Sequence, residues 1–329
     1  MKRILLAAAL VANTAMAQEA QPLEGAWTGR IGNSAINACF SKSEGQYFYQ
    51  RQLEGIVLTA PEEKDDSWRD PEGAWKISRV TATEMEGVWL GDGKRLTIRM
   101  TRLGPLQDGE CSAAYYAPVV NGVKYEFSDG HISGLPLRLL KSPLGMSFEM
   151  KGTTPAIRQF NFFSRQWREN QAIHAFSCKL NGGDGWESDL TAGSVFNHYL
   201  LVQENGLDNS CGGAHGNSAH ATLLFDLRTG QKVNTYAWLA NGEASLTEPA
   251  EGKPKPALRK LLEKLNRSDD CKGMSYDFNA PFPTTTGLTF STSYPHAGRA
   301  CNEDIQVSYA RLAPYLSAEG KAFVKSIKH

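Results

Sequence analysis

The sequence carries no excess of charge of either sign, with 35 Lys and Arg against 35 Asp and Glu in 329 residues. Binding to a nucleic-acid backbone needs clustered positive charge, so this balance argues against a nucleic-acid partner. After the N-terminus, no stretch approaches the ~18 consecutive apolar residues of a membrane-spanning helix, and we expect no membrane span. Hydrophobic residues at 41% and aromatic residues at 10% are typical of packed globular domains, and the length predicts two of them.

Signatures of several enzyme classes are also missing. The sequence holds no G-x-S-x-G, S-x-x-K or H-E-x-x-H motif, and Gly87 to Lys94 misses the spacing of a P-loop by one residue. No two cysteines have the C-x-x-C spacing of a zinc knuckle or a thioredoxin-like site. We therefore expect a protein without a cofactor, and the sequence favours binding over catalysis.

The first 17 residues have the three parts of a secretory signal peptide. Lys2 and Arg3 form a basic start, residues 4–12 form a short apolar stretch, and Ala15-Met16-Ala17 offers the small residues of a cleavage site. The apolar stretch is too short to span a bilayer, which disfavours the alternative of an uncleaved anchor. We expect export, with localisation in the periplasm or outside the cell.

The sequence has six cysteines, an even number. In an exported protein this favours disulfides over metal ligation, because the compartment is oxidising. Many pairings are possible, but if each domain closes its own loops, sequential pairing is the simplest. It joins Cys39 to Cys111, Cys178 to Cys211 and Cys271 to Cys301.

Residues 18–152 are predicted to form an all-β domain. From Leu23 to about Thr101, short strand-like stretches recur between turn residues about every 8 to 12 positions, as in an antiparallel barrel or sandwich. In residues 95–101 apolar and polar side chains alternate, which is typical of a strand with one buried face. A Gly-x-Trp pattern recurs at Gly25-Ala26-Trp27, Gly73-Ala74-Trp75 and Gly87-Val88-Trp89. Together with Gly45-Gln46-Tyr47-Phe48-Tyr49 and Ile56-Val57-Leu58, this segment of about 80 residues resembles small lipocalin-like β domains of exported bacterial proteins.

Further strands are predicted near Tyr115-Tyr116 and at residues 146–150, separated by turns that contain glycine and proline. The pattern changes near residues 151–155. We place the domain boundary there and expect the second domain at residues 153–329.

The second domain is predicted to be α+β, with an antiparallel sheet and packed helices. Apolar residues at helical spacing predict a helix within residues 156–178, ended by Asn181-Gly182-Gly183. The other predicted elements are extended segments at Val195 to Glu204 and Ala219 to Leu227, a loop between them at Asn205 to Ser218, a helix at Pro256 to Arg267, and a last helix that starts near Ser317, a plausible N-cap.

The most unusual stretch is Cys211 to Asn217, in which three glycines surround one histidine. Glycines there permit positive φ and leave backbone N–H groups accessible. This run, then Phe225 to Gly230, then Val307 to Tyr309 with Leu312 to Leu316, resembles the C-terminal domain of unknown function shared by the lysozyme-sensing anti-sigma factor RsiV and PdaC-type peptidoglycan deacetylases. The resemblance covers about 150 residues.

The resemblance implies an extracytoplasmic domain that binds rather than catalyses, since this region of the anti-sigma factor binds lysozyme. Cys211 departs from the family, which often has a polar residue there, and a signalling role does not carry over because sigma-binding and membrane segments are missing. We expect a non-catalytic binding protein whose partner is a lysozyme-like protein or a peptidoglycan fragment. The candidate binding residues are Gly212, Gly213, His215, Asn217, Tyr294 and His296.

Three other interpretations remain open. The imidazole of His215 could bond only its own loop, with a purely structural role. A metal-dependent hydrolase centred on His215 could use His198, His215 and His220 as ligands. Alternatively, the first domain could be a cup that carries a small apolar ligand.

Overall fold

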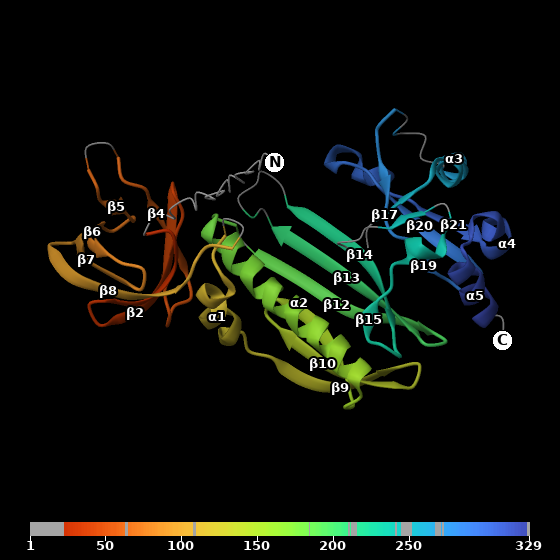
Figure 1. Cartoon of the computed structure of the whole chain (residues 1–329), viewed down its shortest axis with the longest axis horizontal. Coiled ribbons are helices and arrows are strands. Elements are labelled where there is room, and N and C mark those ends of the chain that lie inside the picture. The colour runs from red at the N-terminus through yellow and green to blue at the C-terminus, as the bar shows by residue number, and fades with distance from the viewer. Residues whose placement is uncertain are drawn as a thin grey trace, which may run out of the picture. The chain divides into compact units, whose positions relative to one another are not determined.

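The computed structural model shows two compact units, Met1–Ala117 and Pro118–His329 (Figure 1). The expected signal peptide, residues 1–17, lies outside the described residues and stays a prediction. Within the described part of the chain, no helix is both long and apolar enough to cross a membrane. The structure describes residues 23–62, 65–107, 110–183, 185–209, 211, 216–240, 242–244, 252–266, 271 and 273–327.

The first unit contains a closed antiparallel barrel of eight strands, in which each strand pairs with the next and β8 returns to β1. This confirms the predicted β-barrel. The alternation in β8 buries Ile98 and Met100 and leaves Thr97 and Arg99 exposed. The strands are β1 Gly25–Ile31, β2 Ser34–Phe40, β3 Glu44–Tyr49, β4 Gly55–Thr59, β5 Trp68–Arg69, β6 Ala74–Val80, β7 Glu84–Gly91 and β8 Lys94–Gly104.

Aromatic side chains fill the barrel. Trp27 and Trp75, both from the Gly-x-Trp pattern, are fully buried. Phe40 meets Trp68 and Trp75 edge-on, with ring centroids 5.1 and 6.1 Å apart. An eight-stranded barrel has an interior just wide enough for its own side chains, so these rings occupy the space that a carried ligand would need.

Two polar contacts hold the tryptophans of the barrel. The guanidinium of Arg102 lies 4.2 Å from the ring centroid of Trp27. Asp70 Oδ2 accepts hydrogen bonds from Tyr47 Oη at 3.0 Å, Trp75 Nε1 at 3.1 Å and Trp89 Nε1 at 2.9 Å. Each buried indole or phenol donor at Asp70 is thereby satisfied, as close packing without water requires.

Helix α1, Ala113–Gly122, corrects the prediction of a strand near Tyr115-Tyr116. Tyr115 is fully buried and packs edge-on against Phe48, with ring centroids 5.1 Å apart. Its carbonyl accepts a hydrogen bond from Asn37 Nδ2 at 2.8 Å. Aromatic residues favour strands locally, but these contacts with β2 and β3 stabilise a helical turn instead.

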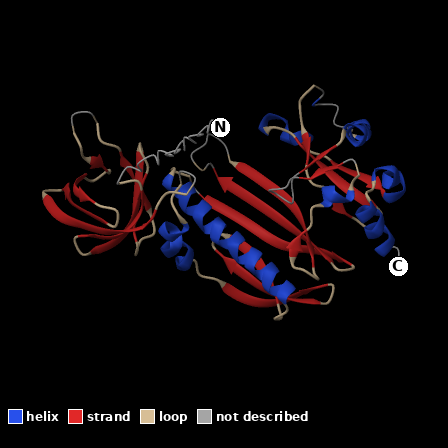
Figure 2. Cartoon of the chain, in the orientation of Figure 1, coloured by secondary structure: helices blue, strands red, loops and turns tan. Residues whose placement is uncertain are grey.

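The second unit contains a long helix, α2 Pro155–Leu180, beside two antiparallel sheets (Figure 2). The two sheets meet where Ser188 N–H donates to Leu144 C=O at 2.8 Å. One has the order β11-β10-β9 and the other β12-β13-β14-β15. Their strands are β9 Glu126–Ile132, β10 Leu135–Ser142, β11 Gly145–Met150, β12 Gly185–Phe196, β13 Tyr199–Asn209, β14 Asn217–Asp226 and β15 Gln231–Lys232.

Helix α2 confirms the helix predicted within residues 156–178. It begins after Thr154, whose side chain accepts from Ile157 N–H at 3.2 Å, and Pro155 occupies its first turn. The predicted breaker follows at once, because Asn181 is the C-cap.

The strand predictions after α2 are partly wrong. Strand β12 was not predicted. The segment Val195 to Glu204, predicted as one extended segment, contains a tight turn between β12 and β13, with Asn197 at φ 54°. Strand β14 confirms the other predicted segment. The connection is shorter than predicted, because β13 extends to Asn209 and β14 begins at Asn217.

The sheet β12–β15 contributes to two hydrophobic cores. Val202 and Phe225 pack in the core that includes Phe160 of α2. Leu201 and Leu224 are their neighbours in sequence and point to the opposite face of the sheet. They pack in a second core together with the C-terminal part of the chain, which comprises the elements after β15. Both faces of this sheet are therefore covered around these residues.

The C-terminal part surrounds Trp238, which is fully buried. Its two main helices confirm the predictions, and Ser317 caps the last one by accepting from Gly320 N–H at 3.1 Å. The elements are η1 Thr235–Trp238, β16 Gly242–Ala244, β17 Gly252–Pro254, α3 Pro256–Leu265, β18 Asp277–Phe278, β19 Phe282–Pro283, β20 Gly287–Ser293, η3 His296–Cys301, β21 Asp304–Ser308, α4 Tyr309–Leu312, η4 Ala313–Tyr315 and α5 Ala318–Ser326.

The chain has the α+β fold that the sequence predicts, with a barrel followed by antiparallel sheets and helices. The domain ranges 18–152 and 153–329 stay predictions; strands β9–β11 lie in the second compact unit. The sequential disulfide pairing is confirmed, and three disulfides indicate an oxidising, extracytoplasmic environment. The bonds join Cys39 to Cys111, Cys178 to Cys211 and Cys271 to Cys301.

Candidate functional site

The predicted recognition residues lie mainly in the connection between β13 and β14. Gly212, Gly213 and His215 fall outside the described residues, so their roles stay predictions. Asn217 is the first residue of β14 and pairs in register with Asp208 of β13. The two strands are therefore paired up to the start of this connection.

A disulfide anchors the same connection to α2. Cys211, two residues after β13, is bonded to Cys178 near the end of the helix. Gly183 packs directly against the bond, because a Cβ there would lie 2.6 Å from Cys178 Sγ and 2.7 Å from Cys211 Cα. The base of the connection is thus held by a strand pair and by a covalent link.

Tyr294 is not an exposed anchor. It is 6% exposed, its ring stacks on that of Tyr276 at 4.6 Å, and its hydroxyl accepts from Asn266 Nδ2 at 3.0 Å. His296 begins η3. The structure places Tyr294 in packing, the alternative that its sequence context also allows, and a binding role for Tyr294 and His296 stays a prediction.

The alternative metal ligands His198 and His220 lie far apart on their sheet. His198 precedes Tyr199, the register partner of Asp226, whereas His220 lies six positions away from Asp226 along β14. At ~3.3 Å per residue this separates them by about 20 Å, too far to share one ion. Among the described residues, no group of three His, Cys, Asp or Glu is placed to hold a metal.

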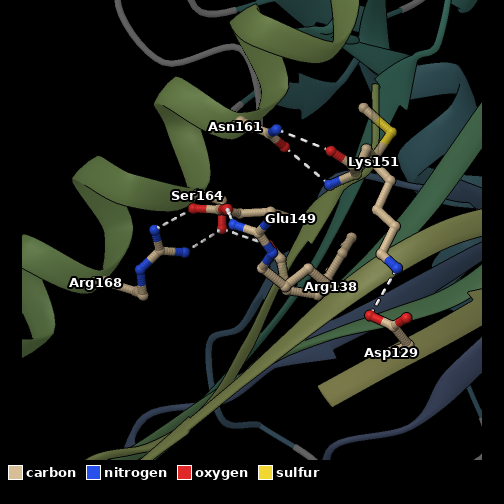
Figure 3. Close-up of polar contacts among 9 residues, drawn as sticks. Asp129, Arg138, Glu149, Lys151, Asn161, Ser164 and Arg168 are labelled. Carbon is tan, nitrogen blue, oxygen red and sulfur yellow. Dashed lines mark hydrogen bonds and ion pairs between the residues drawn. The ribbon is translucent and has the colours of Figure 1, made fainter. Parts of the chain in front are cut away.

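A polar cluster forms where α2 runs along the outer edge of β11 (Figure 3). The side-chain amide of Asn161 accepts from Met150 N–H at 2.8 Å and donates to Met150 C=O at 2.9 Å. One turn further along the helix, Ser164 Oγ donates to Phe148 C=O at 2.6 Å. Side chains of α2 thus take the place of a neighbouring strand and protect this edge.

Arg168 completes the cluster. It donates to Ser164 Oγ at 3.0 Å and to Glu149 Oε1 at 2.6 Å, and its side chain is only 10% exposed (Figure 3). Arg138 lies 3.9 Å from the other oxygen of Glu149. A guanidinium buried to this degree needs a charged partner, so Glu149 both permits the burial of Arg168 and fixes its position.

A small cleft opens beside Arg168, lined also by Tyr125, Ser147, Trp167 and Gln171. Ser147 Oγ is buried and has no hydrogen-bond partner among the described residues. Burial raises the pKa of Tyr125, so its phenol stays protonated. The enclosed space is about 10 Å³, room for one water molecule. The cleft can therefore accept one small polar group of a larger ligand.

The described residues that line this cleft include neither a histidine nor a carboxylate that could act as a base for Ser147. This cluster was not predicted from the sequence, although one signal was present. Polar residues at helical spacing interrupt the apolar pattern of α2 at Asn161, Ser164, Arg168 and Gln171.

Comparisons with known proteins address the fold. Neither a protein-family model nor a curated protein matches the sequence. Among solved structures, a DUF3298 family protein of Pseudomonas aeruginosa PAO1 matches with 16% identity and a TM-score of 0.37, covering 60% of this chain and 94% of that one. The chain resembles DUF3298 proteins.

A member of the same family from Bacteroides fragilis NCTC 9343 matches with 13% identity and a TM-score of 0.34, covering 63% of this chain and 96% of that one. Both matching structures belong to the DUF3298 family, which is the C-terminal domain type of RsiV and PdaC. The predicted resemblance to this domain type is therefore confirmed. Neither DUF3298 protein supplies a ligand or a residue role for the present chain.

Proposed function

We propose that the protein is an extracytoplasmic, non-catalytic binding protein that engages a lysozyme-like protein. The observation that carries this proposal is the anchored base of the β13–β14 connection, paired up to Asp208 and Asn217 and bonded from Cys211 to Cys178. Restraining a binding loop before it meets its partner lowers the entropy lost on binding.

The size of the clefts also favours a macromolecular partner. The cleft beside Arg168 and a second one beside Thr235 each enclose about 10 Å³, far below the several hundred Å³ of a typical small-molecule site. Protein partners are recognised over surfaces instead. Gly212, Gly213 and His215 would supply backbone N–H groups and an imidazole to such a surface.

The test uses the purified full chain and lysozyme. We expect the two proteins to co-elute in gel filtration, and we expect the chain to slow the lysis of cell walls by lysozyme. His215→Ala should weaken binding, whereas His131→Ala, a change at an exposed position on β9, should not. If neither co-elution nor slowed lysis occurs at micromolar concentrations, a lysozyme-like partner is ruled out.

A peptidoglycan fragment is the second candidate, and the cleft beside Arg168 favours it. The unpaired hydroxyl of Ser147 and the amide of Gln171 would hold one polar group of a sugar or peptide, while Trp167 and Tyr125 flank it. Soluble peptidoglycan fragments should then shift the fluorescence of the wild-type chain. Ser147→Ala, which removes a hydroxyl without a partner among the described residues, should abolish that response, and an unchanged titration would exclude this site.

The alternative interpretation, a metal-dependent hydrolase centred on His215, is tested alongside the binding experiments. The separation of His198 from His220 leaves His215 without the ligand set that the sequence analysis considered. Metal analysis of protein purified without a histidine tag decides the matter. One equivalent of zinc that disappears in His215→Ala would favour the hydrolase over the binding protein.

A further inference from the structure

The outer edge of β14 is paired along only part of its length. β15 covers the last two residues of β14, and Val233 N–H then donates to Leu224 C=O at 2.7 Å. Beyond Val233 the chain turns away into η1, Thr235–Trp238, whose N-cap is Asn234. Among the described strands, none is hydrogen-bonded to the edge of β14 before Leu224, although β19 packs close to β14 near Thr222.

The register identifies which peptide groups face this edge. In an antiparallel strand the N–H and C=O of alternate residues point to the same side. The C=O of Leu224 points toward β15, so the peptide groups of Thr222 and His220 point to the same side, beyond the end of β15. His220 is exposed, and its side chain contacts Asn205 of β13 across the sheet.

This edge lacks the features that usually prevent strand addition. Residues 217–222 contain no Lys, Asp, Glu or Pro, which are the residues that typically protect open edges. By contrast, the outer strand β9 carries the exposed carboxylates Glu126 and Asp129, and α2 covers the outer edge of β11. Of these three edges, that of β14 is the one without protection.

A cleft lies where the chain leaves β14. Thr222, Val233, Thr235 and Phe282 line it, and it has room for about one water molecule. Thr235 is 3% exposed, and its Oγ1 is buried with no hydrogen-bond partner among the described residues. An unpaired buried hydroxyl is costly, and a peptide group placed at the cleft would satisfy it.

We propose that an extended segment of a protein partner adds to the sheet as a strand along His220 and Thr222 and ends at the cleft beside Thr235. Peptide N–H and C=O groups at two-residue spacing are matched by another extended backbone. The hydrophobic cores cover both faces of the sheet near Leu223 to Phe225, and His220 beyond them is exposed, so an added strand can reach this part of the edge. Only the identity of the partner, a lysozyme-like protein, rests on the proposed function.

The test compares two variants at one position. His220→Pro removes the N–H that faces the open edge, and proline is tolerated there because that N–H is not used by β13. His220→Val keeps the N–H but also loses the imidazole, so it is the matched control. Circular dichroism and the thermal midpoint establish that both variants fold.

We expect His220→Val to bind lysozyme with the affinity of the wild type. His220→Pro should bind at least about tenfold more weakly, because it loses a backbone hydrogen bond and its ring clashes with the added strand. Equal affinity of the two variants would overturn the edge as the docking site. If the wild type does not bind lysozyme, the partner is wrong and a second probe decides about the edge.

That probe is the strand-forming peptide acetyl-Thr-Val-Thr-Val-Thr-amide, titrated at millimolar concentration and followed by amide NMR shifts. Shifts at residues 217–222 in His220→Val that are missing in His220→Pro would support the edge without any lysozyme binding. The absence of shifts in His220→Val would refute it.

Discussion

Replacing Asp70 by Ala should destabilise the barrel strongly. The carboxylate accepts hydrogen bonds from Tyr47, Trp75 and Trp89, whose side chains are 3, 0 and 7% exposed. The backbone N–H groups of Glu72 and Gly73 donate to its other oxygen at 2.8 and 2.6 Å. Truncation would leave the three aromatic donors without an acceptor inside the packed barrel.

The magnitude follows from these three donors. A buried donor without a partner costs about 1 kcal/mol or more, which gives about 3 kcal/mol for the set. In a domain of this size 1 kcal/mol lowers the midpoint by about 4–8 °C, so Asp70→Ala should lower the Tm of the barrel by about 12–24 °C. Asp66→Ala, at an exposed position just before β5, whereas Asp70 follows β5, is the control.

Tryptophan fluorescence during thermal unfolding is the assay, because Trp75 and Trp89 both contact the carboxylate. The Asp70→Ala protein should also show altered emission before unfolding, since two indole N–H groups have lost their acceptor. We expect a shift of about 12 °C or more, so a midpoint for Asp70→Ala within about 3 °C of that of the Asp66→Ala control would refute the reasoning.

The same contacts predict a pH dependence. Burial raises the pKa of Asp70, but hydrogen bonds from Trp89, Glu72 N–H, Trp75 and Tyr47 outweigh it and hold this pKa below the ordinary value. A group with a lowered folded pKa stabilises the protein above its unfolded pKa, about 4 for Asp, and the contribution is lost as the pH falls through the folded pKa. The difference in Tm between wild type and Asp70→Ala should therefore narrow below about pH 4.

Two further predictions concern the second unit. Arg168→Met should lower the free energy of unfolding by about 2 kcal/mol in urea, because the partly buried Glu149 carboxylate loses its closest partner; a neutral effect would show that the ion pair is dispensable. Replacing both Cys178 and Cys211 by Ser should cost about 3–4 kcal/mol for a loop closed over 33 residues, and it should weaken partner binding even at temperatures where the chain stays folded. Unchanged affinity would argue against an anchored recognition loop.

Local patterns predicted the parts of the fold that depend on local interactions. The helix α2 has a Thr-Pro start, an apolar stripe and an Asn-Gly-Gly end within one stretch of sequence, and Ser317 begins α5 in the same way. Helix α1 could not be found, because Tyr115 is held by Asn37 and Phe48 from distant strands. Two adjacent tyrosines favour a strand until such contacts are known.

The polar cluster around Arg168 could not be predicted from the sequence, again because it depends on contacts between distant segments. Arg168 would be interpreted as a surface residue of an amphipathic helix, since charged residues are rarely buried. Its burial depends on Glu149 of β11, which lies about 20 residues away in the sequence and is brought close only by the packing of α2 on the sheet edge. Strand β12 was missed because its buried Ser188 is polar.

The location of the proposed binding surfaces follows from how the β12–β15 sheet is covered. Neighbouring residues such as Leu200 and Leu201 point to opposite faces and are both buried, each in a different core. A sheet buried on two faces leaves its edges and its strand ends for recognition. One end of this sheet is anchored to α2 through Cys211, and one edge is open at His220. The two proposals therefore concern adjacent parts of β14, and a partner that engaged the connection before Asn217 could extend along the same strand.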